Sequence, residues 1–154
     1  MMITENRSWR GFTLIEMVMV LFVISVIALI PNLKLPDMER KLDNQFFFEE
    51  FERLITITQE SAVFSGRASR IIMKRNERSV AFDYVLSNGV KTHYYVEIPE
   101  DIRAETDTFV TFLGETGTLS KVTKFKFLLT KSQKKVVYQF YLGSGKYAKK
   151  ESEV

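Results

Sequence analysis

The order of apolar and polar residues divides this 154-residue chain into three parts. Residues 12–30 are almost wholly apolar, and Glu16 is the only ionisable side chain among them. From about Asp37 to Val63, apolar residues recur every three or four positions, which is typical of an amphipathic helix. From Ser69 onward the alternation has a period of two, which is typical of half-buried β-strands. The chain therefore begins with two helical segments and continues as a sheet.

The first apolar segment is long enough to cross a membrane. Its 19 residues, from Phe12 to Ile30, would span about 28 Å as a helix, close to the roughly 30 Å hydrocarbon core of a bilayer. Arg7 and Arg10 precede it. Because positive residues stay on the cytoplasmic side, we expect the rest of the chain to lie outside the membrane.

The same segment fits a secretory signal peptide or a permanent anchor only in part. A signal peptide has an apolar region of about 7–15 residues, and Val26-Ile27-Ala28 resembles its cleavage site. This segment is longer, and Glu16 would lie inside the apolar region. A permanent single-pass anchor explains the length, but it leaves the burial of Glu16 as a cost of up to about 2–3 kcal/mol.

The second segment predicts a helix that packs on a sheet. Pro31 and Pro36 are expected to interrupt the chain before it, because proline lacks a backbone donor and clashes with the preceding turn. The predicted apolar stripe consists of Leu42, Phe46, Phe47, Phe51, Leu54, Ile55, Ile57 and Phe64. Of the three successive phenylalanines, residues 46–48, one is a candidate for contact with a neighbouring subunit.

The third part predicts an antiparallel meander of about five or six strands. Asn88-Gly89 is a strong hairpin signal, because both residues tolerate positive φ. Pro99 to Thr106 is predicted to be an acidic loop, and the tail from Ala148 to be loose. The predicted strands include residues 71–75, 80–86, 90–98, 109–112, 125–129 and 136–142. One helix covering such a sheet is an α+β architecture.

The run Arg10-Gly11-Phe12-Thr13-Leu14-Ile15-Glu16 resembles the N-terminus of type IV prepilins and pseudopilins. The resemblance implies cleavage between Gly11 and Phe12 by a prepilin peptidase, and N-methylation of Phe12. It implies a leader (1–11), a transmembrane and filament-core helix (12–30) and an extracellular pilin-like domain (31–154), with a helix at about 37–63 and a sheet at about 69–147. Glu16 would pair with the Phe12 amine of its own or a neighbouring subunit during assembly.

Composition narrows the possible functions. The chain has no cysteine, one histidine (His93) and a net charge of +3, which argues against disulfides, thiolate chemistry and multi-histidine metal sites. We therefore expect no enzyme activity and no cofactor. His93 is expected to be a strand residue that faces solvent.

A cysteine-free, lysine-rich chain of this size most resembles Gram-positive competence minor pseudopilins. Type II secretion H-type minor pseudopilins and minor type IV pilins are alternatives within the class. A membrane-anchored extracellular binding domain is the alternative outside it. The resemblance implies other major and minor pseudopilins, a prepilin peptidase and an assembly platform protein as partners. It also implies the membrane before assembly and a cell-surface pseudopilus afterwards.

Lysines gather near the C-terminus. Nine lie between Lys121 and Lys150, where no acidic residue occurs. In residues 124–127 a period of two puts both lysines on one face of a strand and both phenylalanines on the other. The candidate contact residues, for DNA or for another subunit such as the Pro99–Asp107 loop of a second copy, are Lys124, Lys126, Lys131, Lys134 and Lys135.

Overall fold

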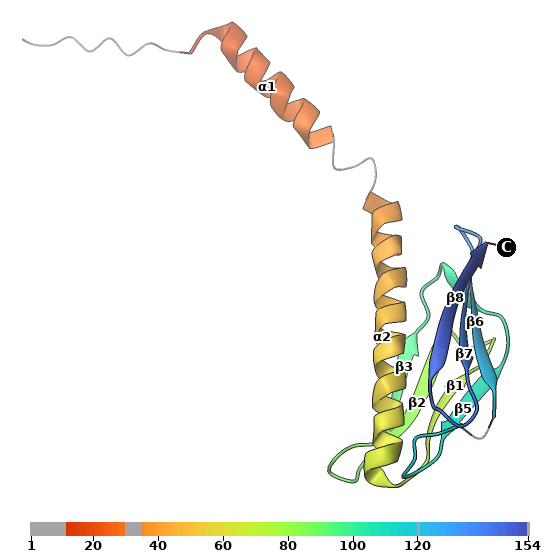
Figure 1. Ribbon diagram of the computed structural model, residues 1–154. Helices are drawn as coiled ribbons and strands as arrows, with labels where there is room; N and C mark the ends of the chain where they lie inside the picture. Colours follow the sequence, from red (N-terminus) through yellow and green to blue (C-terminus); the bar gives the residue numbers. More distant parts are fainter. Residues whose placement is uncertain (1–11, 30–34, 120, 154) are drawn as a thin grey trace, which may run out of the picture. The chain divides into compact units, whose positions relative to one another are not determined.

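The computed structural model describes residues 12–29, 35–119 and 121–153. Its contacts divide the chain into two units, residues 1–39 and 40–154, which are described separately. The described elements (Figure 1) are α1 (Leu14–Leu29), α2 (Leu35–Ser65), β1 (Ser69–Met73), β2 (Ser79–Val85), β3 (Lys91–Glu97), β4 (Ile102–Ala104), β5 (Thr108–Phe112), β6 (Thr123–Leu129), β7 (Lys134–Phe140) and β8 (Tyr147–Glu153).

The first unit contains α1, a helix of 16 residues. The described side chains of residues 14–28 are all exposed, and apart from Glu16 and Ser25 they are apolar on every side of the helix. Ile30, expected to end the apolar segment, lies outside the described residues. No helix in the described part of the chain is both long and apolar enough to span a membrane.

Helix α2 is longer than the predicted 37–63 and runs from Leu35 to Ser65. Pro36 lies in its first turn and does not interrupt it, because the first turn needs no donor from that position. The helix ends before Gly66, whose φ of 65° suits a helix C-terminus. Pro31 lies outside the described residues.

The prediction of an α+β fold is confirmed, but the prediction of five or six strands in one meander is wrong. Eight described strands form two antiparallel sheets of four, in the orders β3-β2-β1-β5 (sheet A) and β4-β6-β7-β8 (sheet B). The predicted acidic loop contains β4, which pairs with β6. The predicted loose tail is β8, which pairs with β7 along its whole length.

Both predicted hairpins are present. Strands β2 and β3 pair on either side of the Asn88-Gly89 turn, where Gly89 has a φ of 81°. Strands β6 and β7 pair from Thr123↔Phe140 to Leu129↔Lys134. This register fixes which side chains share a face of sheet B, because residues directly opposite in an antiparallel pair point the same way.

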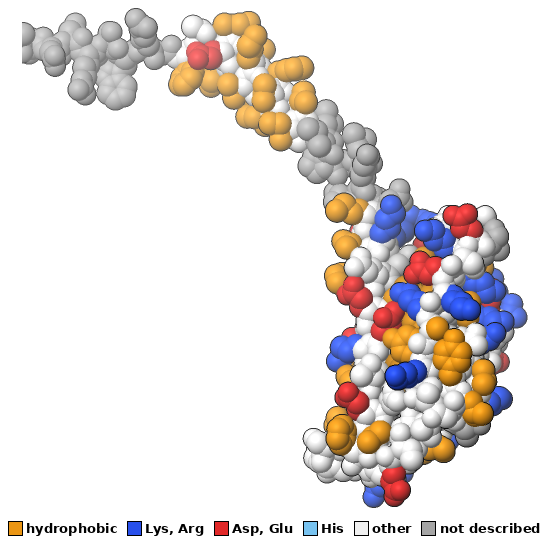
Figure 2. All heavy atoms as spheres, in the orientation of Figure 1, with side chains coloured by type: hydrophobic (Ala, Val, Ile, Leu, Met, Phe, Trp, Pro, Cys, Tyr) orange, Lys and Arg blue, Asp and Glu red, His pale blue; other side chains and the backbone are white. Residues whose placement is uncertain are grey.

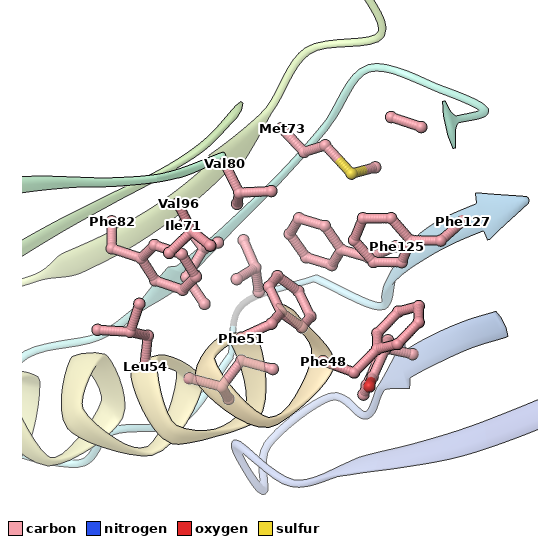
Figure 3. Close-up of a cluster of buried hydrophobic side chains, with 14 of the residues drawn as sticks. Phe48, Phe51, Leu54, Ile71, Met73, Val80, Phe82, Val96, Phe125 and Phe127 are labelled. Atoms are coloured by element: carbon pink, nitrogen blue, oxygen red, sulfur yellow. The ribbon is translucent and has the colours of Figure 1, made fainter. Parts of the chain in front are cut away.

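The core lies between α2 and the inner faces of the two sheets (Figures 1 and 3). Phe51 of α2 is fully buried and lies at the centre of this core. Its ring is 5.8 Å from that of Phe82 in sheet A and 5.1 Å from that of Tyr138 in sheet B. Edge-to-face ring pairs at such distances are favourable beyond their buried area, so Phe51 joins both sheets to the helix.

The predicted apolar stripe of α2 was too broad. At about 100° per residue, the buried residues Phe47, Phe48, Leu54 and Ile55 lie within about 60° of Phe51 around the helix. Leu42, Phe46 and Phe64 lie about 140–180° away from Phe51 by the same rule. Their exposed fractions are 44%, 62% and 86%, so they face away from the core.

Candidate functional site

The N-terminal candidate residues lie at the start of α1. Gly11 lies outside the described residues. Phe12 lies two residues before the first residue of the helix and is 76% exposed, and Glu16 lies in the first turn. The structure therefore describes Phe12 and Glu16 but not the predicted cleavage bond.

Thr13 caps this helix, a role that the sequence reasoning missed. The backbone N–H of Glu16 donates to Thr13 O (3.1 Å) and lies 3.4 Å from Thr13 Oγ1. Thr13-Leu14-Ile15-Glu16 has the spacing of a capping box, which was a signal available in the sequence. An acid in the first turn also complements the helix dipole. Glu16 thus has a local role at the helix start that is independent of any pairing with an amine.

The lysines near the C-terminus lie on different faces of sheet B. Phe125 and Phe127 are fully buried, and Lys124 and Lys126 alternate with them on the outer face of β6, as predicted. Lys135 shares this face, because it lies opposite Leu128 in the register. Lys134 has the opposite parity in β7, so the prediction that it joins the same surface is wrong. Lys131 lies in the turn between β6 and β7.

Two further cations share the outer face and were not predicted. Arg103 of β4 lies opposite Leu128, and Lys150 of β8 lies opposite Val137. The reason is that β4 and β8 were not recognised as strands. We call the resulting surface the basic face; its cations are Arg103, Lys124, Lys126, Lys135 and Lys150.

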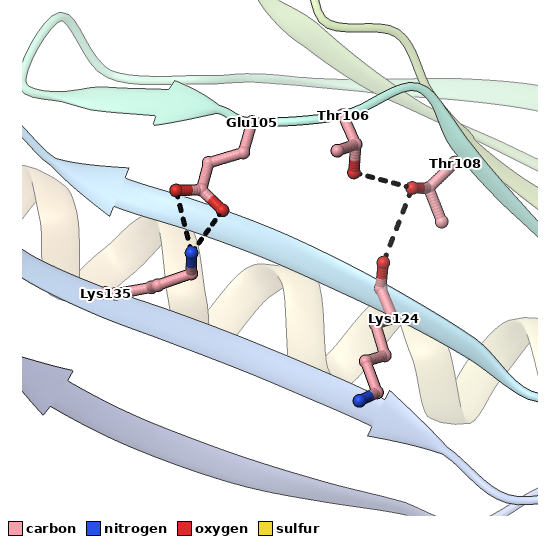
Figure 4. Close-up of polar contacts among 5 residues, drawn as sticks. All are labelled: Glu105, Thr106, Thr108, Lys124 and Lys135. Atoms are coloured by element: carbon pink, nitrogen blue, oxygen red, sulfur yellow. Dashed lines mark hydrogen bonds and ion pairs between the residues drawn. The ribbon is translucent and has the colours of Figure 1, made fainter.

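One acid also lies on the basic face. Glu105 follows β4 and holds Nζ of Lys135 at 2.6 Å from Oε2 (Figure 4). On the same face, Thr108 Oγ1 donates to Lys124 O at 3.4 Å, which ties the start of β5 to β6. No ion pair involves Arg103, Lys124, Lys126 or Lys150 within the described residues. Four of the five cations are therefore available to an external anion.

Other charged groups near the sheet serve the fold. Nζ of Lys149 lies on the inner side, 3.1 Å from Oε1 of Glu52. The same carboxylate oxygen accepts a 2.7 Å hydrogen bond from Tyr138 OH. Burial, followed by the hydrogen bond to Glu52, raises the pKa of Tyr138 far above its ordinary value, so this phenol stays protonated.

The acidic segment between β3 and β5 is also used internally. Asp101 accepts from Asn44 Nδ2 (2.9 Å), Thr130 Oγ1 (2.9 Å) and Lys131 N (3.0 Å). Burial alone would raise the pKa of Asp101, but these hydrogen bonds together hold it below its ordinary value. Asp107 accepts from the backbone N–H of Arg75. Three acids of this segment, Asp101, Glu105 and Asp107, therefore already have partners within the molecule.

His93 is exposed on β3, as predicted, and its Nδ1 lies 2.7 Å from Oδ1 of Asp83. Among the described residues, no group of three or more histidine, cysteine or acidic side chains is placed to hold a metal ion.

Comparisons with known proteins agree with the pilin resemblance. The family model described as the prokaryotic N-terminal methylation motif matches residues 10–30. The competence protein ComGD of Streptococcus pneumoniae is 28% identical over 137 residues, which cover 89% of this chain and 77% of that protein.

The fold has a counterpart among solved structures. The type IV minor pilin FimU of Pseudomonas aeruginosa superposes with a TM-score of 0.54 at 19% identity, over 75% of this chain and 92% of that one. At this identity the likeness concerns the fold alone. The chain therefore carries a prepilin-type methylation motif, has a type IV pilin-like fold and is similar to ComGD.

Proposed function

We propose that this protein is a minor pseudopilin of a competence pseudopilus, which assembles through its N-terminal helix and supports the uptake of extracellular DNA. The observation that carries this proposal is the motif around Gly11, Phe12 and Glu16, which lies inside the matched methylation motif. The similarity to ComGD over most of the chain favours the competence system. An H-type minor pseudopilin of type II secretion or a minor type IV pilin is the alternative.

The proposed life cycle begins in the membrane. The precursor crosses it once through residues 12–30, with the leader (1–11) in the cytoplasm and residues 31–154 outside. A prepilin peptidase cuts between Gly11 and Phe12, and Phe12 is methylated. An assembly platform protein then moves the subunit into a filament with major and minor pseudopilins at the cell surface. The protein's role in this scheme is structural and not catalytic.

The side chains of α1 support this mechanism. Its described surface is apolar on every side except at Glu16 and Ser25, so the helix can exchange lipid for neighbouring apolar helices at little cost. Glu16 would be the one acid in such a bundle, and the amine of Phe12 would neutralise it. A buried carboxylate is strongly unfavourable without such a partner.

The outer side of α2 offers a second contact in the filament. Leu42 and Phe46 are one helical turn apart, and they face away from the core with exposed fractions of 44% and 62%. We propose that these two side chains pack against a neighbouring subunit. Of the three successive phenylalanines, Phe46 is therefore the one that we expect to contact a neighbour, because Phe47 and Phe48 are buried.

The experiment that tests the proposal separates the two roles of Glu16. Glutamine can replace glutamate in a capping box, but it has no charge to pair with an amine. Glu16→Gln and Glu16→Ala are each expressed in the native host. We expect both chains to be processed, yet not to copurify with the other pseudopilins, and we expect transformation to fall to the level of a gene deletion. Glu60→Gln, an exposed change on α2, is the control and should behave as wild type.

Two outcomes would contradict the proposal. If Glu16→Gln assembles and transforms normally while Glu16→Ala fails, Glu16 acts as a helix cap and not as an ion-pair partner. If deletion of the gene leaves transformation unchanged and abolishes secretion or adhesion, the protein belongs to one of the alternative filaments.

A further inference from the structure

We infer that the basic face of sheet B binds the phosphate backbone of duplex DNA; this inference rests on the proposed role in DNA uptake. Each of the four strands contributes at least one cation to the face. They are Arg103 from β4, Lys124 and Lys126 from β6, Lys135 from β7 and Lys150 from β8. Within the described residues, Glu105 is the one acid placed among them.

The spacing of these cations suits a polyanion. Neighbouring strands lie about 4.8 Å apart, and alternate residues lie about 6.8 Å apart along a strand. The five cations therefore spread over about 14 Å in each direction. Duplex DNA carries one negative charge per about 1.7 Å of its axis, so one flank of a duplex presents several phosphates to such an area.

Figure 2 shows how unevenly charge is distributed on the visible side of the domain. Lysine and arginine side chains are frequent over β8 and the neighbouring edge, whereas charges of both signs and apolar side chains alternate along α2. The cationic side chains are therefore concentrated at sheet B, although the net charge of the chain is only +3. Such concentrated charge attracts anions over several ångströms.

The composition of the basic face favours the backbone of a duplex over unpaired bases. Within β4, β6, β7 and β8 the described outward-facing residues include no aromatic side chain, since Phe125, Phe127 and Tyr138 all point into the core; Tyr141, which is 41% exposed, lies just beyond the end of β7. Single-stranded nucleic acid is usually bound by stacking on exposed aromatic rings. Lysine, by contrast, contacts phosphate as a point charge without reading sequence.

A neighbouring subunit is the competing occupant, and the structure disfavours it. The expected acidic partner was the Pro99–Asp107 loop of a second copy, whose four acids are the exposed Glu100 and the three carboxylates of Asp101, Glu105 and Asp107. Each of these three carboxylates is already engaged inside its own molecule. Lysine is also depleted in protein interfaces, and Leu128 and Val137, the apolar residues at the centre of the face, are partly covered.

The test uses the full mature chain in neutral detergent and a fluorescent duplex of about 20 base pairs. Anisotropy is measured over a series of salt concentrations. With four to five phosphate contacts, the logarithm of the association constant should fall linearly with the logarithm of the salt concentration, with a slope of about −4. The triple variant Lys124→Gln/Lys126→Gln/Lys150→Gln should reduce the magnitude of this slope by about 3 and weaken binding at low salt by at least about tenfold.

The control variant has the same change in charge. Lys91→Gln/Lys131→Gln/Lys134→Gln removes three exposed lysines, none of which lies on the basic face: Lys91 is in β3 of sheet A, Lys131 is in the β6–β7 turn and Lys134 has the opposite parity in β7. It should bind duplex as the wild type does, within about twofold. Glu105→Gln should bind more tightly with a steeper slope, because it removes the one acid and releases Lys135. A gain in affinity cannot result from misfolding.

The outcomes separate this inference from the proposed function. Equal loss in both triple variants would show that only net charge matters, and would overturn the inference, as would the absence of binding at low salt. Loss of copurification with other pseudopilins at unchanged duplex affinity would assign the face to a neighbouring subunit. Duplex binding through the face by a chain that never joins a filament would contradict the proposed function and leave this inference standing.

Discussion

The hydroxyl of Tyr138 donates a 2.7 Å hydrogen bond to Oε1 of Glu52, which joins the middle of sheet B to helix α2. Nζ of Lys149 lies 3.1 Å from the same oxygen and 5.4 Å from the centre of the Phe48 ring. Helix α2 and strands β7 and β8 therefore meet at Glu52. This contact explains how a strand as charged as β8 is held at the edge of the sheet.

Residues 37–154 should fold without the N-terminal helix. All of the described buried core, from Phe47 to Phe140, lies within the second unit. We expect a fragment of residues 37–154 to be monomeric and to unfold in one cooperative thermal transition by circular dichroism. Random-coil spectra without a transition would show that the domain needs other subunits to fold.

Tyr138→Phe should lower the free energy of unfolding of this fragment by about 1–2 kcal/mol, because a hydrogen bond to a charged group is lost. Tyr141→Phe is the control, because this tyrosine is 41% exposed. It should change the free energy of unfolding by less than about 0.5 kcal/mol. Urea unfolding measures both. Because the pKa of Tyr138 is raised in the folded state, its contribution is present below about pH 10 and declines above it. The stability difference between wild type and Tyr138→Phe should therefore shrink in alkali.

Asp101 should make the fold sensitive to acid. Its pKa is held below the ordinary value by Asn44, Thr130 and Lys131 against the effect of burial. A lowered carboxyl pKa stabilises the folded state above about pH 4, and this contribution is lost as the pH falls through the folded-state pKa. Asp101→Asn should lower the free energy of unfolding at pH 7 by about 1 kcal/mol. Between about pH 4 and pH 2, the free energy of unfolding should fall less in this variant than in the wild type. Glu100→Gln, a change at the adjacent exposed acid, should leave the acid profile as in wild type; equal profiles for Asp101→Asn and wild type would refute the role of Asp101.

Two glycines of the loop between β7 and β8 should respond differently to alanine. Both have positive φ, 73° at Gly143 and 63° at Gly145. A Cβ at Gly143 would meet nothing within 4 Å, whereas one at Gly145 would collide with the Gln59 side chain and the Gly117 carbonyl. Gly143→Ala should cost about 1 kcal/mol for the backbone strain alone. Gly145→Ala should cost at least about 1 kcal/mol more, as overpacking does. Equal melting temperatures for the two variants would show that this loop is not locked against α2.

The helices and the hairpins could be predicted because their signals are local. The spacing of three and four around Phe51 indicated α2, and Asn88-Gly89 indicated the β2–β3 turn. The alternation in residues 124–127 correctly separated Lys124 and Lys126 from the buried phenylalanines. Adjacent lysines, such as Lys134 and Lys135, cannot share a strand face, so this part of the patch was predictable but was misjudged.

The two edge strands of sheet B could not be recognised from the same patterns. Strand β4 has three residues, too few to show a period. Strand β8 is mostly exposed and so shows no apolar alternation; it is held by backbone pairing with β7 and by the contact of Lys149 with Glu52. Without these strands, Arg103 and Lys150 could not be assigned to the basic face. The pairing of Lys135 with Glu105 likewise depends on the long-range pairing of β4 with β6.

The most direct test of the account is the intact mass of the protein isolated from its native host. We expect a chain that begins at Phe12, has lost residues 1–11 and carries one added methyl group on its N-terminal amine. Fragmentation of the N-terminal peptide places the methyl group. A mature chain that begins near Pro31 would support a signal peptide, and an uncut chain that begins at Met1 would support a permanent anchor; either result would contradict the proposed role as a pseudopilin.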